Sequence, residues 1–521
     1  MAKRSLKYNA AVLSVTGFVV KVIGFFYRIF IANSIGSEGL GLYQLVTPIY
    51  SLLILVLSAG VQIAVSRFVA EETSHKTDYK GMKIANLSAG IVLAAGIIVS
   101  TILLININTL VFSFTGDERT RRSLIYILLL VPPIAAASAY KGYFYGREEM
   151  LPNAIAQILE QASKLVFVIL LYGTFKGKGV ESMCLLAVLA LLFGEVVNVL
   201  TVFIVFITRK TVKKNNQYSR KKRSWKAIKK ICKVAVPISV NRLILSVIGT
   251  AESLVIPRRL MLYGYNVQES LKTFGRLSGM AAPLVFFPSM LPGALATALV
   301  PAIASAFASK RYYVANRQIS QSIKLTLTMG LIFTSFFACC SHEIAELIYP
   351  GQEVGKILYI LSFTGVFLYL QQTMLGILNG LSREKTILVN TLIGSVIRLI
   401  SVWFLMPLYG IEAYVFSVIA GSIIVVILNF KEIIKITGIS IDLGEWFLKP
   451  VATALTGSFV AILLKNMPKY LPIPLKVKLI LAAGLSFAAI VLFFFLAGVI
   501  KRDDIIRWSG NRIGGEKQRK N

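Results

Sequence analysis

The chain has few charged residues, few cysteines and histidines, and no stretch of ordinary soluble composition long enough to form a separate domain. Charged residues make up 15% of it, against about 25% in soluble proteins. Four cysteines and two histidines, without the spacing of metal ligands, predict no metal site. Cys339 and Cys340 fall in an apolar segment, where cysteine acts as a small hydrophobic residue.

Catalytic and nucleotide-binding motifs are also missing. The sequence contains no phosphate-binding loop, no dinucleotide fingerprint, no metal-binding HExxH and no plausible Ser/His/Asp set. These absences argue against an enzyme and against a primary pump within this chain, and we expect no cofactor.

Long apolar segments recur along the whole chain, and hydrophobic residues make up 56% of it. Each segment is near the roughly 20 residues that a helix needs to cross a bilayer, and all are too long and continuous for barrel strands. We therefore predict an all-α polytopic membrane protein with about fourteen transmembrane helices, the first retained in the mature protein. The segments lie near 8–31, 41–66, 82–106, 122–146, 154–173, 183–208, 231–256, 278–306, 320–341, 355–378, 385–408, 411–434, 446–465 and 477–499.

The net charge of +32 comes from 56 Lys and Arg against 24 Asp and Glu. In a membrane protein this excess indicates cytoplasmic loops, because these collect Lys and Arg. With both termini in the cytoplasm, that side receives about 34 Lys and Arg and the other about 13. The basic loop over 208–230 would then lie against anionic lipid head groups, and we expect no nucleic-acid partner.

A weak internal repeat divides the chain. Ser14-Val15 and Val22-Ile23-Gly24 recur as Ser239-Val240 and Val247-Ile248-Gly249, and AVSRFVAE from Ala64 resembles ALVPAIAS from Ala298. Both copies begin on the same side, so the repeat is parallel. The predicted parts are an N-lobe over 1–208, a basic linker over 209–230, a C-lobe over 231–434, two further helices over 435–500 and a basic tail over 501–521.

Ionisable residues inside the apolar segments are the main functional signal, because a charge in lipid is costly and usually faces a cavity or a partner. Lys21 and Arg28 are seven residues apart, on one face of the first predicted helix. Cations on the first helices of the two lobes would suit an anionic head group such as a pyrophosphate. The candidate cations for such a site are Lys21, Arg28, Arg242 and Arg398.

The carboxylates in the same segments can have one of two roles, pairing with a cation of the protein or binding a coupling ion. Glu160 and Lys164 form an i,i+4 pair that either neutralises itself or takes part in ion coupling, and Glu195 lies in the next helix. Glu252 would bind a coupling cation or pair with an arginine, and Arg398 would face a cavity or pair with a carboxylate.

Proline is concentrated in the eighth predicted helix. Each proline removes a backbone donor and kinks a helix, so this span would be either a gating element or a fixed kink needed for packing. The prolines are Pro283, Pro288, Pro292 and Pro301.

Three sequence stretches resemble the stage V sporulation protein B branch of the polysaccharide transporter family, within the superfamily of multidrug, oligosaccharidyl-lipid and polysaccharide exporters. They are KVIGFFYRIFIANSIGSEGLGLYQL from Lys21, AVSRFVAEE from Ala64 and TALVPAIASAFA from Thr297. The resemblance implies a two-lobed transporter that works by alternating access on a polyprenyl-pyrophosphate-linked saccharide. For this branch it implies a peptidoglycan precursor and a role in making the spore cortex.

The resemblance also assigns residues. Related lipid II flippases carry two cavity-facing arginines around a Gly-Phe, and here Lys21 and Arg28 flank Gly24-Phe25. Arg276 is the candidate for a further cavity arginine at the start of helix eight. The alternatives are a cation-coupled exporter of amphipathic drugs and a membrane-embedded glycosyltransferase. The mainly basic cavity residues and the lack of a sizeable extramembrane loop favour the flippase.

Overall fold

The computed structural model describes residues 6–73, 78–208, 243–439 and 444–500, and within these ranges every regular element is a helix. Arg242, the linker over 209–230 and the tail over 501–521 lie outside the described residues. The bounds of the first elements are α1 Leu6–Thr73, α2 Asp78–Ile105, α3 Ile107–Leu110, the π-helix η1 Val111–Thr115, the 3-10 helix η2 Glu118–Thr120, α4 Arg121–Gly146, α5 Leu151–Phe175 and α6 Val180–Ile207.

The second part of the chain continues as helices. Residues 243–262 are helical, and the next span is a series of short pieces: α8 Val267–Phe274, the π-helix η3 Gly275–Ala281, α9 Ala282–Phe286, the 3-10 helix η4 Phe287–Ser289 and α10 Met290–Ala308. The remaining elements are α11 Tyr312–Cys339, α12 Ser341–Ile348, α13 Gly355–Ser362, α14 Gly365–Gly380, α15 Glu384–Tyr409, α16 Ile411–Thr437, η5 Gly444–Leu448, α17 Lys449–Leu464, η6 Met467–Tyr470 and α18 Leu475–Leu496.

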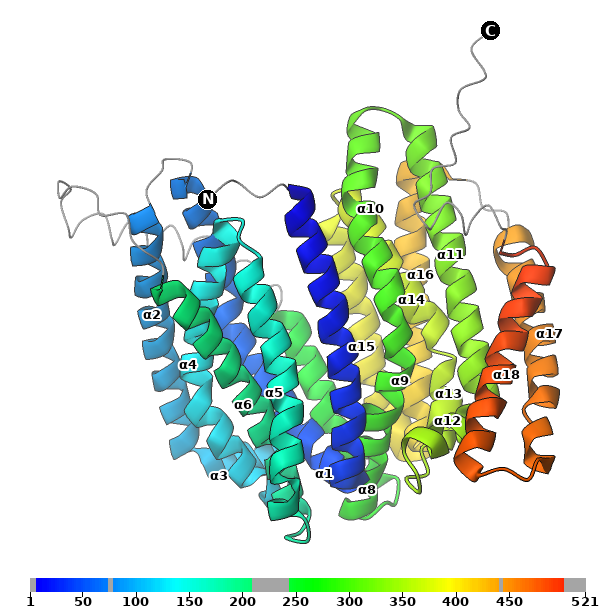
Figure 1. Cartoon of the computed structure of the whole chain (residues 1–521), viewed down its shortest axis with the longest axis horizontal. Coiled ribbons are helices and arrows are strands. Elements are labelled where there is room, and N and C mark those ends of the chain that lie inside the picture. Colours follow the sequence, from blue (N-terminus) through cyan, green and yellow to red (C-terminus); the bar gives the residue numbers. More distant parts are fainter. Residues whose placement is uncertain (1–5, 74–77, 209–242, 440–443, 501–521) are drawn as a thin grey trace. The chain divides into compact units, whose positions relative to one another are not determined.

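The first two predicted helices are the two arms of α1, which meet at a kink. Helical structure continues through α1 and is interrupted only at Gly36, where a φ of 71° lies in the left-handed region that favours glycine. This break separates a first arm from a second arm. The dark blue first arm runs down to the bottom of Figure 1.

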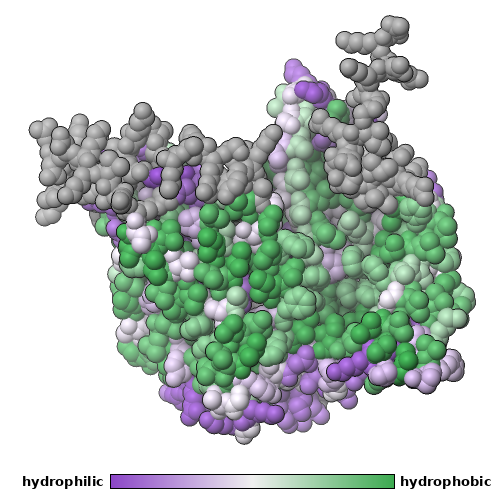
Figure 2. Space-filling view, viewed as in Figure 1, coloured by the Kyte–Doolittle hydropathy of each residue, from purple (hydrophilic) through white to green (hydrophobic). Residues whose placement is uncertain are grey.

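Eleven described helices are long and apolar enough to cross a membrane, or twelve if the bent pair α13 and α14 is one span. Apolar side chains are exposed along them, and Figure 2 shows hydrophobic residues over the lengths of the helices with hydrophilic residues gathered at their ends. This surface fits contact with lipid chains. The expected count of about fourteen is compatible with these spans and stays a prediction.

The chain forms two compact units. Unit 1 contains residues 1–283 and 392–417, and unit 2 contains residues 284–391 and 418–521. In unit 1 a buried apolar core surrounds Leu124 and Leu128 of α4. In unit 2 the core gathers around Met374 and Ile377 of α14, and the α17–α18 hairpin packs on α11.

The same close helix crossing occurs once in each unit. In unit 1, a Cβ on Gly142 of α4 would lie 2.5 Å from the carbonyl oxygen of Gln62, in the second arm of α1. In unit 2, a Cβ on Gly376 of α14 would lie 2.5 Å from the carbonyl oxygen of Ala296 on α10. Glycine permits such approach because it has no side chain.

The two crossings are equivalent in sequence. Positions 62 and 142 become 296 and 376 when each is moved by 234 residues. This is also the offset between Ala64 and Ala298, which begin the second pair of matching stretches, whereas Ser14 and Ser239 of the first pair are 225 positions apart. The contacts therefore support the parallel repeat, whose copies are called the first repeat (6–207) and the second repeat (243–437). The exact lobe boundaries stay a prediction.

Candidate substrate and coupling site

Glu160 is the centre of a buried polar cluster in unit 1. Its Oε1 accepts hydrogen bonds from Lys164 Nζ at 2.5 Å and Gln161 Nε2 at 3.2 Å. Its Oε2 accepts from Asn198 Nδ2 of α6 at 2.7 Å. Both carboxylate oxygens are thus satisfied, as a buried charge requires. The i,i+4 pair expected from the sequence is present, and it extends across to a second helix.

Gly194 makes room for this cluster. A Cβ at Gly194 would lie 2.5 Å from Cγ and 2.6 Å from Cε of Lys164, and 2.9 Å from the carbonyl oxygen of Glu160. The aliphatic stem of Lys164 therefore lies across the backbone of α6. Its ammonium group reaches Glu160 only because position 194 has no side chain.

Glu195 follows Gly194 and adds a second carboxylate beside the cluster. Its carboxyl group contacts the hydroxyl of Tyr50 and lies within electrostatic reach of Glu160, Lys164 and Lys141. Two acidic groups therefore share this region with two lysines, and one of these, Lys164, is paired with Glu160. The charge of Glu195 is less directly compensated than that of Glu160, and its role in ion coupling stays a prediction.

Lys21 and Arg28 are both exposed on the first arm of α1. Between them, a Cβ on Gly24 would lie 3.5 Å from Gln161 Oε1, so this stripe of α1 runs beside the polar cluster. Within the described ranges, neither cation has an ion-pair or hydrogen-bond partner. Two uncompensated cations in an apolar helix can attract an anionic group.

Arg398 and Glu252 form a second ion pair, also in unit 1. Arg398 Nη2 and Nε donate to Glu252 Oε2 at 2.7 and 2.8 Å, and the Glu252 side chain is 7% exposed. The pairing alternative fits both residues in this structure. Within the described ranges, no hydrogen bond or ion pair joins Arg398 to Lys21 or Arg28, so its substrate-binding role stays a prediction.

The two paired cations are equivalent in the repeat. Lys164 of α5 becomes Arg398 of α15 when it is moved by the 234 positions that relate the helix crossings. Each repeat thus places one cation at the same point of the corresponding helix and neutralises it with a different carboxylate. The cations were visible in the sequence, but the partner of Arg398 was not.

The remaining predicted residues occupy the helix 267–308. Arg276 is half-buried in η3, which packs on α1. Pro283 follows the π-helix and Pro288 lies in the 3-10 helix η4, so the span does contain irregular turns. Pro292 and Pro301 lie in α10. The boundary between units 1 and 2 falls directly after Pro283. Whether these irregular turns act in gating stays a prediction.

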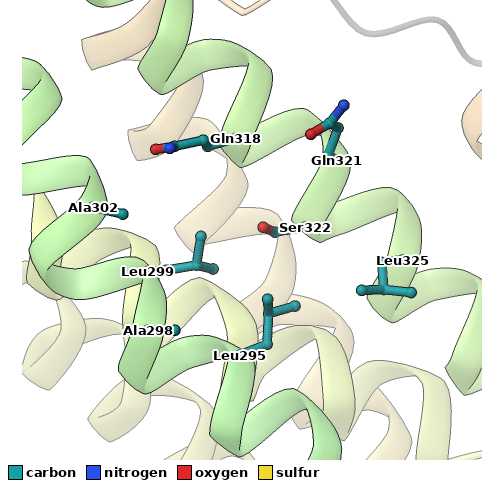
Figure 3. A pocket seen from close by; sticks show the side chains of 8 residues that line it. All are labelled: Leu295, Ala298, Leu299, Ala302, Gln318, Gln321, Ser322 and Leu325. Carbon is teal, nitrogen blue, oxygen red and sulfur yellow. The ribbon is translucent and has the colours of Figure 1, made fainter. Parts of the chain in front are cut away.

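A groove of about 260 Å³ lies between α10 and α11 in unit 2. Figure 3 shows Gln318, Gln321 and Ser322 of α11 beside alanine and leucine side chains of α10. The groove carries no charged side chain. It therefore does not offer the positive charge that a pyrophosphate requires.

The described cysteines, Cys184, Cys339 and Cys340, are buried. These thiols therefore act as small hydrophobic side chains and not as nucleophiles. Cys232 lies outside the described residues.

Sequence reasoning missed several partners of the candidate site. Asn198 and Gln161 are uncharged, and nothing in their spacing links them to Glu160 before the helices are packed. Gly194 could have been noticed because it directly precedes Glu195, a carboxylate inside an apolar segment.

Comparison with known proteins places the chain in a family. A family model described as polysaccharide biosynthesis protein matches residues 6–307, and one described as MatE matches residues 278–404. The chain belongs to the polysaccharide biosynthesis protein family. The match covers the first repeat, with the Glu160 cluster and the α1 cations, and extends through α10.

Proteins of Bacillus subtilis are similar to this chain in sequence. It is 27% identical to stage V sporulation protein B over 97% of this chain and 98% of that protein. It is 24% identical to lipid II flippase MurJ over 82% of each chain. These relatives confirm the family resemblance read from the sequence.

Solved structures share the fold. Lipid II flippase MurJ in an inward closed conformation superposes with a TM-score of 0.65 at 16% identity, covering 94% of this chain and 100% of that one. An inward-facing multidrug resistance MATE transporter gives a TM-score of 0.61 at 17% identity, covering 82% and 98%. The neighbours whose names state an activity are transporters or flippases, and this confirms the expectation that the chain is not an enzyme. The protein is a multi-pass membrane protein with a transporter fold.

Proposed function

We propose that this protein is a flippase that moves a polyprenyl-pyrophosphate-linked saccharide across the cytoplasmic membrane by alternating access. The cargo we assign is a peptidoglycan precursor used in spore cortex synthesis. The observation that carries the proposal is the pair of exposed cations, Lys21 and Arg28, on one face of an otherwise apolar helix. The names of two relatives, a sporulation protein and a lipid II flippase, support the choice of cargo.

The charges suggest how the head group would be held. A pyrophosphate carries negative charge and several acceptor oxygens, and Arg28 can meet two of them with the planar fork of its guanidinium group. Lys21 would add a point charge two turns away. Lys164 is neutralised by Glu160 and does not compete for the anion. The polyprenyl chain would remain among the lipid chains while the head group crosses.

The Glu160 cluster would couple this movement to an ion. Glu195 lies beside Glu160. The face of α1 that carries Lys21 and Arg28 packs on α5 at Gln161, the residue next to Glu160. Uptake of a proton or cation there would change the field at the α1 cations and thus their hold on an anion. The alternative is a cation-coupled drug exporter, because a multidrug resistance MATE transporter has the same fold.

The test is translocation of a fluorescent polyprenyl-pyrophosphate-linked peptidoglycan precursor by the purified protein in liposomes. We expect transport by the natural protein and a fall of about tenfold or more in Lys21→Ala and in Arg28→Ala, equal to about 1.4 kcal/mol each. Arg67→Ala is the matched control, because Arg67 is an exposed arginine of α1 paired with Glu71 in the second arm. Export of a cationic dye without movement of the precursor would establish the drug exporter instead.

A further inference from the structure

Arg259 and Trp403 form a stacked pair on the surface of unit 1. Arg259 belongs to the helix over 243–262 and Trp403 to α15, and both residues lie in unit 1. The guanidinium carbon of Arg259 lies 3.3 Å from the centre of the Trp403 ring, well inside the roughly 6 Å of a cation–π contact. At this distance the guanidinium group must lie nearly flat on the ring, because a tilted group would push a nitrogen into it.

The residues beside the pair hold the two helices together. Leu260, Val402 and Met406 are fully buried in one apolar cluster. At the ends of the helices, a Cβ on Gly410 would lie 2.9 Å from Cε1 of Tyr263, so the two ends also meet. The helices that carry Arg259 and Trp403 are thus fixed by their core, and the stacked geometry does not have to be assembled when a ligand binds.

The N–H groups of Arg259 remain available to a ligand. A guanidinium group carries five N–H donors in its plane, and stacking on a ring uses only its face. Within the described ranges, the Arg259 side chain makes no hydrogen bond and no ion pair. The neighbouring Arg258 differs, because its Nη2 donates to the carbonyl oxygens of residues 112–114 at 3.3, 2.7 and 3.1 Å. Of two adjacent arginines, one is bound to backbone and the other is open.

The surface around the pair is a lipid-facing one. α15 is long and apolar enough to cross a membrane. Its exposed apolar side chains, Ile393, Val396 and Ile400, recur at the three- and four-residue spacing of one helix face. The same spacing leads to Trp403, which is 48% exposed. Acyl chains of lipids can therefore lie along this face and reach the stacked pair.

The pair lies at the depth of lipid head groups. Arg259 is three residues from the end of its helix and Trp403 is six residues from the end of α15, which correspond to about 5 and 9 Å along the axes. Exposed tyrosines, Tyr263 and Tyr409, mark the same ends. Tyr and Trp gather at the membrane–water interface. The free donors of Arg259 therefore lie where lipid phosphates are found.

We propose that Arg259, stacked on Trp403, binds the phosphodiester of an anionic glycerophospholipid whose acyl chains lie on the exposed face of α15. The planar fork of arginine can donate two parallel hydrogen bonds to phosphate oxygens, and the ring beneath it keeps the fork in place. A lipid is favoured over a free phosphate because its chains gain apolar contact with this face. The pair supplies positive charge alone, which suits an anionic head group better than a zwitterionic one.

This site goes beyond the proposed function, because a membrane lipid would occupy it whatever the cargo is. Trp403 itself supplies the test, since bromine atoms on lipid chains quench tryptophan fluorescence on contact. The other three tryptophans, Trp225, Trp446 and Trp508, are changed to phenylalanine in the full-length protein. The protein is reconstituted in phosphatidylcholine that contains a small, equal fraction of brominated phosphatidylglycerol or of brominated phosphatidylcholine.

We expect brominated phosphatidylglycerol to bind beside Trp403 about fivefold more strongly than brominated phosphatidylcholine. Arg259→Ala should make the two lipids equal, and Arg259→Lys, which keeps the charge but loses the fork, should remove most of the preference. Equal quenching by the two lipids while Arg259 is present would overturn the site.

Arg258→Ala is the matched control, because it removes the same charge one residue away from a side chain that is already bound to backbone. The preference for phosphatidylglycerol should survive in this variant. If Arg258→Ala lowers the preference as much as Arg259→Ala does, with both variants folded, the lipid responds to general positive charge and the inference is wrong.

A second measurement separates a lipid from a free anion. Phosphatidylglycerol added to the protein in detergent should raise the midpoint of thermal unfolding, because a ligand of the folded state stabilises it, and Arg259→Ala or Trp403→Leu should lose most of this rise. Inorganic phosphate at the same concentration should have little effect. An equal rise with inorganic phosphate would contradict a lipid site. No cargo is present in either measurement, so failure of the proposed function would leave this result unchanged.

Discussion

A single carboxylate, Glu160, accepts hydrogen bonds from three side chains on two helices. Lys164 and Gln161 bind one oxygen and Asn198 binds the other. Because this charge is fully paired, the positive charge of Lys164 is not available to substrate. On the first arm of α1, Lys21 and Arg28 are exposed and have no ion-pair partner within the described residues. Three cations that look alike in the sequence thus separate into one that is buried and paired, Lys164, and two that are exposed, Lys21 and Arg28.

Removing one member of the buried pair should be worse than removing both. Lys164→Met leaves the Glu160 carboxylate with neutral donors only, and we expect a loss of about 3 kcal/mol in stability, since breaking a buried pair strands a charge. Adding Glu160→Gln to Lys164→Met should recover most of it. The measurement is the midpoint of thermal unfolding in detergent for the two single variants and the double variant. Equal losses that simply add would show that the pair is not coupled.

Helices of this protein meet at glycines in equivalent positions of the two repeats. Gly142 and Gly146 bring α4 against the second arm of α1, and Gly376 and Gly380 bring α14 against α10. Such contacts matter in a bilayer, where lipid chains remove the hydrophobic drive for helix association and close packing replaces it. The repeat is therefore preserved in backbone contacts even where its side chains differ.

Alanine at the paired glycines should have matched effects. A methyl group at Gly142 or at Gly376 would overlap the carbonyl of the facing helix, so each variant should lose about 1–3 kcal/mol through overpacking. Gly90→Ala, with open space around it, should be neutral or slightly stabilising because alanine favours helix. Thermal unfolding in detergent compares the three variants. A large loss at Gly142 with none at Gly376 would argue against equivalent crossings.

The helices, the repeat and the ionisable residues could be predicted from the sequence. A membrane-spanning helix requires a long apolar segment, and a charged residue within such a segment is rare because it is costly in lipid. The tightness of the turn between the two arms of α1 could not, because the 32–40 stretch is rich in small and polar residues that are typical of a longer loop. Only the packed structure shows that a single left-handed residue, Gly36, is enough for the break. The pairing of Arg398 with Glu252 was also hidden, since the two are 146 positions apart in sequence.

At the scale of the whole molecule, the exposed cations Lys21 and Arg28 of α1 and the neutralised Glu160 cluster beside them would act together in one transport cycle. The family match and the flippase and transporter folds support the general activity. The choice of a pyrophosphate-linked cargo depends on the charges of Lys21 and Arg28. The sign and the chemistry of the substrate head group therefore decide whether the proposed function is correct.

Translocation of two cargoes in the same liposomes separates the possibilities. One cargo is a saccharide on a polyprenyl pyrophosphate, and the other is the same saccharide joined to the same lipid through an uncharged linkage. We predict that the protein moves the pyrophosphate form at least about tenfold faster, and that added salt narrows the difference by screening the charges. Equal rates for the two cargoes, or faster movement of the uncharged one, would contradict the proposed function.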